Sequence, residues 1–220
     1  SWNAMVRGQG DKLTAMTSVI LGEALFALPV VFFVPFPAAA SWPYIAASVV
    51  LHTGYGLVLM LAYRIGELTL VYPIARGSAP LMVAALSAAL IGEVLPEGAT
   101  LAILTLCAGI LTLGLVRSAD GTFDLKASVL ALLVGCFIAA YSICDGIGAR
   151  LAGGAAGYWS WIAVIDVAVF MVIAFALKGW ALAGELRANW RVVLVGGFAC
   201  YMAYLLVIWA FVHAPIALVT

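Results

Sequence analysis

The stretch Gly157–Leu177, GYWSWIAVIDVAVFMVIAFAL, decides the fold class of this chain. Asp166 is the one charged residue among its 21 positions. About 20 apolar residues in an α-helix cross the hydrocarbon core of a bilayer, which is about 30 Å thick. We therefore predict that Gly157–Leu177 is a transmembrane helix.

Six more apolar runs of comparable length fill most of the remaining chain. Hydrophobic residues make up 66% of the 220 positions and charged residues 9%, and the mean hydropathy is +1.20. A soluble globule would lack polar residues to cover its surface, and barrel strands would be shorter and alternate in polarity. The sequence predicts an all-α, polytopic transmembrane helix bundle with seven complete spans, and an eighth run begins at Ala214. The six runs are Thr14–Phe36, Trp42–Ala62, Leu68–Leu90, Gly98–Val116, Lys126–Cys144 and Trp190–Phe211.

The connections between the runs are too short to hold a soluble domain, so a binding site must lie between helices. The longest expected connections are 145–156 and 178–189. Ten Lys+Arg balance ten Asp+Glu, which gives no basic surface for nucleic acid. The four cysteines lie inside apolar runs without metal-ligand spacing, so we expect no metal site, cofactor or disulfide. Tryptophans near run ends are expected interfacial anchors: Trp42, Trp159, Trp180 and Trp190.

A weak internal repeat relates the two halves of the chain. An offset of 148 residues places Trp42 on Trp190 and Leu57 on Leu205. The order of runs and turns agrees across this offset. A repeat with an odd number of helices would be inverted in the membrane, as in many secondary transporters.

Several short motifs resemble EamA-like members of the drug/metabolite transporter superfamily. They are Ser1–Arg7 (SWNAMVR), Ala62–Arg64 (AYR), Val71–Pro80 (VYPIARGSAP), Gly92-Glu93 and Tyr141–Gly146 (YSICDG). This resemblance implies ten helices in two inverted five-helix repeats around a central cavity.

On this family template, residues 1–116 form the first repeat and 117–220 a truncated second repeat. Trp2–Arg7 would then be the tail of helix 1, and two further helices would follow Thr220. The resemblance implies a secondary transporter or exporter of a small metabolite, such as an amino acid or an amphipathic anion. The implied location is the bacterial cytoplasmic (inner) membrane, where the partners are membrane lipids and a small-molecule substrate.

Arg76 is the clearest polar residue at membrane depth. It lies eight residues into the run Leu68–Leu90, about 12 Å along the helix axis. A charge at the centre of the bilayer costs from about 2.5 kcal/mol and usually faces a cavity or a partner. Pro73 and Pro80 bracket Arg76, and Tyr72 lies on the same helix face. Arg76 is either an anchor for an anionic group of the substrate or one side of a structural ion pair.

Two acidic residues lie within apolar runs and have two open interpretations. Glu23 is the first candidate partner for Arg76, and Asp166 lies near the middle of its run. Each is either a proton-coupling carboxyl group or a structural counter-charge. Asp145 lies nearer the end of a run, which favours a helix-capping or interfacial role.

Two aromatic stripes occur on runs that the internal repeat relates. They form either the walls of a substrate cavity or ordinary helix packing, and His52 is either a structural histidine or a proton carrier. The stripes are His52, Tyr55, Leu59 and Tyr63 in one run, and Tyr201, Tyr204, Ile208 and Phe211 in the other.

The sequence leaves one competing function and two membrane orientations open. An integral-membrane enzyme acting on lipid or prenyl substrates is the alternative, but its clustered Asp or His residues are not apparent, so we do not expect an enzyme. The family resemblance implies a cytoplasmic N-terminus, whereas the positive-inside rule puts the side rich in basic residues in the cytoplasm. If the runs alternate, that side carries Arg7, Lys12, Arg64, Arg117, Lys126, Lys178, Arg187 and Arg191.

Overall fold

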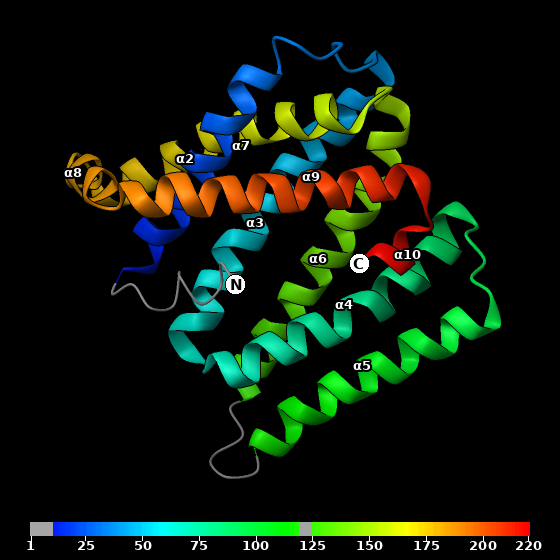
Figure 1. The fold of residues 1–220 in the computed structure, drawn as a ribbon. Helices are drawn as coiled ribbons and strands as arrows, with labels where there is room; N and C mark the ends of the chain where they lie inside the picture. The colour runs from blue at the N-terminus through cyan, green and yellow to red at the C-terminus, as the bar shows by residue number, and fades with distance from the viewer. Residues whose placement is uncertain (1–10, 119–124) are drawn as a thin grey trace. The chain divides into compact units, whose positions relative to one another are not determined.

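The computed structural model describes residues 11–118 and 125–220, apart from the side chains at 68, 69 and 113–118 (Figure 1). The expected helix tail at Trp2–Arg7 lies outside these residues. Throughout the described residues the regular structure is helical. The helices are α2 (Lys12–Val30), α3 (Trp42–Ile65), α4 (Leu68–Ile91), α5 (Glu97–Ser118), α6 (Leu125–Ala152), α7 (Ala155–Lys178), α8 (Ala181–Ala188), α9 (Gly197–His213) and α10 (Ile216–Val219), with a 3₁₀ turn η1 (Ala39–Ser41) and a π-helical turn η2 (Val192–Gly196).

Six helical segments of the described chain are long and apolar enough to cross a membrane. This confirms the prediction of a polytopic helical membrane protein. The predicted run Gly98–Val116 lies in helix α5, but the part of α5 with described side chains, Glu97–Thr112, is shorter than the other six segments. The seventh span therefore stays a prediction. The six segments are α2, η1 with α3, α4 from Leu70, α6, α7, and η2 with α9.

The structure corrects the predicted end of the first run. Helix α2 ends at Val30, whereas the apolar run was expected to continue as helix to Phe36. Pro35 and Pro37 explain the difference, because a residue that precedes proline disfavours the helical conformation. The chain therefore leaves α2 in turns that expose Phe32 and Phe33.

The connections predicted at 145–156 and 178–189 are also wrong in part. Helix α6 continues to Ala152 and stops at Gly153, which has a positive φ of 82°. Gly146 and Gly148 do not break α6. A Cβ on Gly148 would lie 2.4 Å from the Tyr158 hydroxyl, so this glycine permits close helix packing. The second connection contains the short helix α8.

The chain divides into two compact units, and each unit is built from two separate stretches of the sequence. Unit 1 takes the chain up to Thr53 together with Ile147–Val212, and unit 2 takes Gly54–Gly146 with His213–Thr220. Both units draw on the two predicted repeats, 1–116 and 117–220. The division of the chain into two repeats stays a prediction.

Unit 1 is built around helix α2, which packs against α7, the turn η2 and α8. The tightest approach is between Gly22 of α2 and Gly197 of α9. A Cβ on Gly22 would lie 1.8 Å from the Val193 carbonyl oxygen and 2.8 Å from the Gly197 Cα. Small residues allow such close backbone contact between transmembrane helices. Glu23 follows Gly22 directly, so its backbone lies at this crossing.

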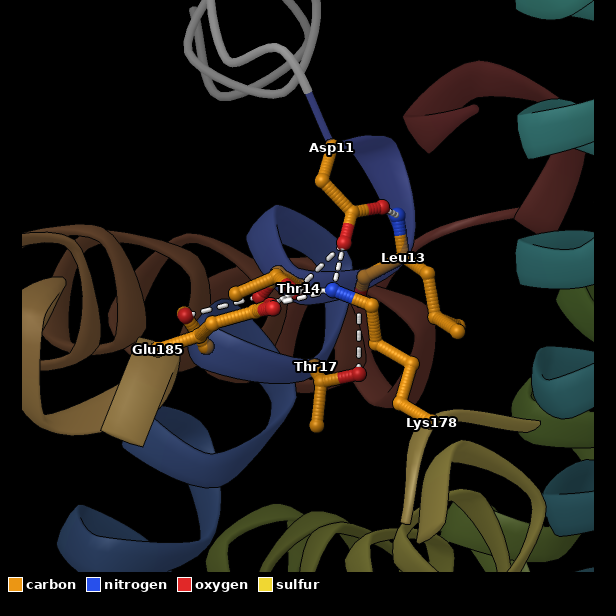
Figure 2. Close-up of polar contacts among 7 residues, drawn as sticks. Asp11, Leu13, Thr14, Thr17, Lys178 and Glu185 are labelled. Carbon is orange, nitrogen blue, oxygen red and sulfur yellow. Dashed lines mark hydrogen bonds and ion pairs between the residues drawn. The ribbon is translucent and has the colours of Figure 1, made fainter. Parts of the chain in front are cut away.

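A cluster of four polar side chains ties α2, α7 and α8 together (Figure 2). The Lys178 ammonium group forms ion pairs with Asp11 and Glu185 and donates a hydrogen bond to Thr14 Oγ1 at 2.7 Å. An ammonium group has three N–H donors, and these three partners use them all. We call Asp11, Thr14, Lys178 and Glu185 the Lys178 cluster.

Unit 2 packs α4 against α5 and α10. Helix α4 runs without a break through Pro73 and Pro80. It ends at Gly92, which adopts the left-handed conformation with φ of 71°. The next residue, Glu93, accepts a hydrogen bond from the backbone N–H of Ile216 at 3.0 Å, and so holds the first turn of α10.

Candidate functional site

The candidate site of unit 1 is a chain of polar residues inside its spanning helices. Asp166 of α7 has 8% of its surface exposed, although it lies in the middle of an apolar helix. Thr53 of α3 is also buried, and its hydroxyl donates a hydrogen bond of 2.7 Å to Asp166 Oδ1. Asp166 interacts electrostatically with His52 on α3 and with Glu23 on α2. Three helices therefore contribute titratable groups to one place.

Glu23 reaches this place because the backbones of α2 and α9 meet beside it. A Cβ on Gly197 would lie 2.7 Å from the Glu23 backbone nitrogen. One turn further along α9, the Cys200 side chain is hydrogen-bonded to the Glu23 carboxyl group. Glu23 itself is half-buried. In this arrangement the charge of Asp166 acts on the Glu23 carboxyl group.

Three aromatic rings pack together around His52, which interacts with Asp166. The centroids of Trp159 and Tyr204 are 4.4 Å apart, and His52 lies 5.2 Å from Tyr204 and 5.7 Å from Trp159. Trp159 has 4% of its surface exposed, and its Nε1 has no hydrogen-bond partner among the described residues. Tyr201, one turn before Tyr204, shares a hydrogen bond of 2.7 Å with Ser160.

Arg76 lies in unit 2, where tyrosines surround it. Its guanidinium group interacts electrostatically with the phenol groups of four tyrosines, and the rings of two of them, Tyr55 and Tyr141, are 5.5 Å apart. Phenol hydroxyls can accept hydrogen bonds from a guanidinium group and leave its other N–H donors for a ligand. The four are Tyr55, Tyr63, Tyr72 and Tyr141.

The structure separates the predicted residues into two groups. Glu23, His52, Asp166, Tyr201 and Tyr204 belong to unit 1, and the other three predicted residues to unit 2. The sequence analysis did not pair Glu23 with Asp166, and the structure shows an electrostatic interaction between them. The predicted ion pair of Glu23 with Arg76 joins residues of different units and stays a prediction. The three residues of unit 2 are Tyr55, Tyr72 and Arg76.

Two sequence interpretations are wrong. Asp145 is fully buried inside α6, because the helix continues for two turns beyond it, so it does not cap a helix end. Trp159 is buried against His52 and Tyr204 and is not an exposed interfacial anchor. The sequence could have indicated that Trp159 faces the helix bundle, because Trp159 and Asp166 are seven residues apart and therefore share one helix face.

Sequence reasoning missed four partners of the predicted residues. Thr53, next to His52, was not distinguished from other polar residues of its run. Ser160 was not singled out, and Cys200 was interpreted only as one of four cysteines without metal-ligand spacing, although each is hydrogen-bonded to a predicted residue. Tyr141 was quoted only within a motif, and it lies beside Arg76.

Comparisons of the chain with protein-family models, with curated proteins and with solved structures found no match. The resemblance to EamA-like transporters therefore stays a prediction that rests on the motifs quoted above.

Proposed function

We propose that the protein is a secondary transporter of a small metabolite and that Glu23, Asp166 and His52 couple it to protons. The observation that carries the proposal is the buried hydrogen bond between Asp166 of α7 and Thr53 of α3, beside which Asp166 interacts electrostatically with Glu23 of α2. Asp166 is buried, hydrogen-bonded to Thr53, and close enough to Glu23 for their charges to interact. Ionisable residues inside the membrane are costly and mark ion pathways and proton relays.

The proposed proton steps follow from the chemistry of these groups. A proton that enters by way of His52 passes to the carboxyl pair, where Thr53 fixes one oxygen of Asp166. A histidine ring can take up a proton at one nitrogen and release one from the other, and repulsion between two nearby carboxylates favours the protonation of one of them. A bound proton would remove the repulsion between Glu23 and Asp166. It would thereby change the energy needed to move α2 relative to α7, and so link proton binding to helix movement.

Arg76 is the proposed anchor for an anionic group of the substrate. Its neighbours are neutral phenols, such as Tyr55 and Tyr141, which leave the positive charge available to a carboxylate. Arginine binds carboxylates through two parallel hydrogen bonds. An amino acid or an amphipathic carboxylate fits this charge and these aromatic faces.

The proposed architecture is that of the EamA-like family, with ten helices in two inverted repeats. The six apolar spans and the motif resemblance support it. The corresponding location is the bacterial cytoplasmic membrane, where a proton gradient is available as a driving force.

A counterflow experiment tests transport directly. Liposomes that contain the intact protein are loaded with an unlabelled compound and diluted into a trace of the same labelled compound. The panel consists of aliphatic amino acids, aromatic amino acids and aromatic carboxylates. We expect uptake of at least one compound above that of empty liposomes, and strong loss of this uptake in Arg76→Gln.

Glu97→Gln is the matched control, because it removes an exposed carboxyl group at the start of α5. It should transport normally. Absence of exchange for the whole panel, together with turnover of lipid or prenyl substrates by the same protein, would replace the transporter with the membrane enzyme.

A further inference from the structure

The short helix α8 lies at the boundary between two membrane spans of unit 1. It begins three residues after α7 ends at Lys178, and the span formed by η2 and α9 begins at Val192. Figure 1 shows α8 nearly end-on beside the ends of α7 and α9, which both run across the view. Helix α8 is therefore crosswise to the two spans. This is the direction of a helix that lies along a membrane surface.

One face of α8 is fixed against the protein. Leu182 and Leu186, one helical turn apart, have 0% and 8% of their surfaces exposed. Glu185 between them is held by Lys178 and Thr14 in the Lys178 cluster (Figure 2). The single carboxylate of α8 is thus paired with Lys178, which also forms an ion pair with Asp11.

The segment from Trp180 to Arg191 exposes two tryptophans and two arginines. Trp180 and Trp190 flank α8 and have 86% and 54% of their surfaces exposed. The Arg191 guanidinium lies 5.4 Å from the centre of the Trp190 ring. Arg187 is also exposed, and neither arginine forms an ion pair with a residue that the structure describes. The segment therefore combines interfacial aromatic rings with positive charge.

We propose that α8 and its flanking tryptophans bind the headgroup of an anionic phospholipid. Tryptophan rings favour the headgroup level of the bilayer, which places Arg187 and Arg191 where lipid phosphates lie. Guanidinium groups bind phosphate oxygens through paired hydrogen bonds. Charge complementarity selects an anionic lipid over a zwitterionic one, because the zwitterionic headgroup brings its own positive charge beside the arginines. The ion pair with Lys178 holds the Glu185 carboxylate and weakens its repulsion of a lipid phosphate.

Lipid titration of the intact purified protein, followed by native mass spectrometry, tests this proposal. The probes are dioleoylphosphatidylglycerol, which is anionic, and dioleoylphosphatidylcholine, which is zwitterionic. A basic residue near an anionic membrane surface contributes about 1 kcal/mol, which corresponds to about fivefold in affinity. We expect Arg187→Gln with Arg191→Gln to weaken binding of the anionic lipid by about 25-fold and to leave phosphatidylcholine binding unchanged.

Arg64→Gln is the matched control, since Arg64 is an exposed arginine in the last turn of α3. It should retain the preference for the anionic lipid. Equal affinity of the original protein for the two lipids would overturn the proposal, and so would unchanged binding in the double variant. Displacement of the anionic lipid by millimolar inorganic phosphate would also overturn it, because the occupant would then be a soluble anion. Helical content measured by circular dichroism confirms that the variants are folded.

Discussion

Adding one methyl group at Gly22 should destabilise the protein strongly. The new Cβ would lie 1.8 Å from the Val193 carbonyl oxygen and 2.8 Å from the Gly197 Cα. These are backbone atoms, so a side-chain rotation cannot remove the clash, and α2 and α9 must move apart. Overpacking of a close contact costs about 1–3 kcal/mol and occasionally more. We expect Gly22→Ala at the upper end of this range, about 3 kcal/mol.

Reversible unfolding of the protein in mixed micelles, with increasing dodecyl sulfate and detection by circular dichroism, measures this change. Gly109→Ala is the control, because a Cβ there would have no neighbour within 4 Å. Gly197→Ala should be as damaging as Gly22→Ala, and the double variant should fall short of the sum, since both relax the same crossing. A Gly22→Ala protein as stable as the Gly109→Ala protein would refute the close crossing of α2 and α9.

Two further predictions concern charged residues. Hydrogen bonds from Lys178 and Thr14 lower the pKa of Glu185, so their stabilising effect is present above the ordinary glutamate pKa of about 4.3 and is lost as the pH falls through the lower folded value. The melting temperature of Lys178→Met should therefore lie below that of the original protein at pH 7, and this difference should shrink at pH 3; a difference that is the same at both pH values would contradict the contact. Arg76→Gln should lower transport; if Glu23 is its structural partner, adding Glu23→Gln should recover folding and much of the activity, because a lone buried charge destabilises by about 3–5 kcal/mol. If Arg76 anchors the substrate, folding will recover without transport, and full counterflow with Arg76→Gln alone would contradict both interpretations.

The spans could be predicted from the sequence because the bilayer imposes one simple requirement on length and polarity. Gly157–Leu177 satisfies it with one charge, and α7 extends this run by only a few residues. The helix ends were harder to predict, because glycine occurs both in turns and at close contacts inside helices. Glycine indicated a turn at 145–156, yet Gly148 lies inside α6 to accommodate the Tyr158 side chain.

The sequence predicted several residues of the candidate site but not which of them interact with one another. Glu23 and Asp166 were recognised because an acidic residue is costly in an apolar run. Their proximity depends on the crossing of α2 with its neighbours, which no periodicity within one helix describes. For the same reason, the sequence could not show that the Thr53 hydroxyl is hydrogen-bonded to Asp166 or that Cys200 is hydrogen-bonded to Glu23.

The effect of Asp166→Asn on proton coupling tests the central claim most directly. Liposomes that contain the intact protein and a compound from the counterflow panel are placed under an imposed pH gradient, and accumulation of the compound is compared with its counterflow at equal pH. Counterflow needs the substrate site, whereas accumulation also needs a residue that binds and releases a proton. The account predicts that Asp166→Asn retains counterflow and loses accumulation driven by the pH gradient, while Glu97→Gln retains both. Accumulation by Asp166→Asn equal to that of the original protein would contradict the account.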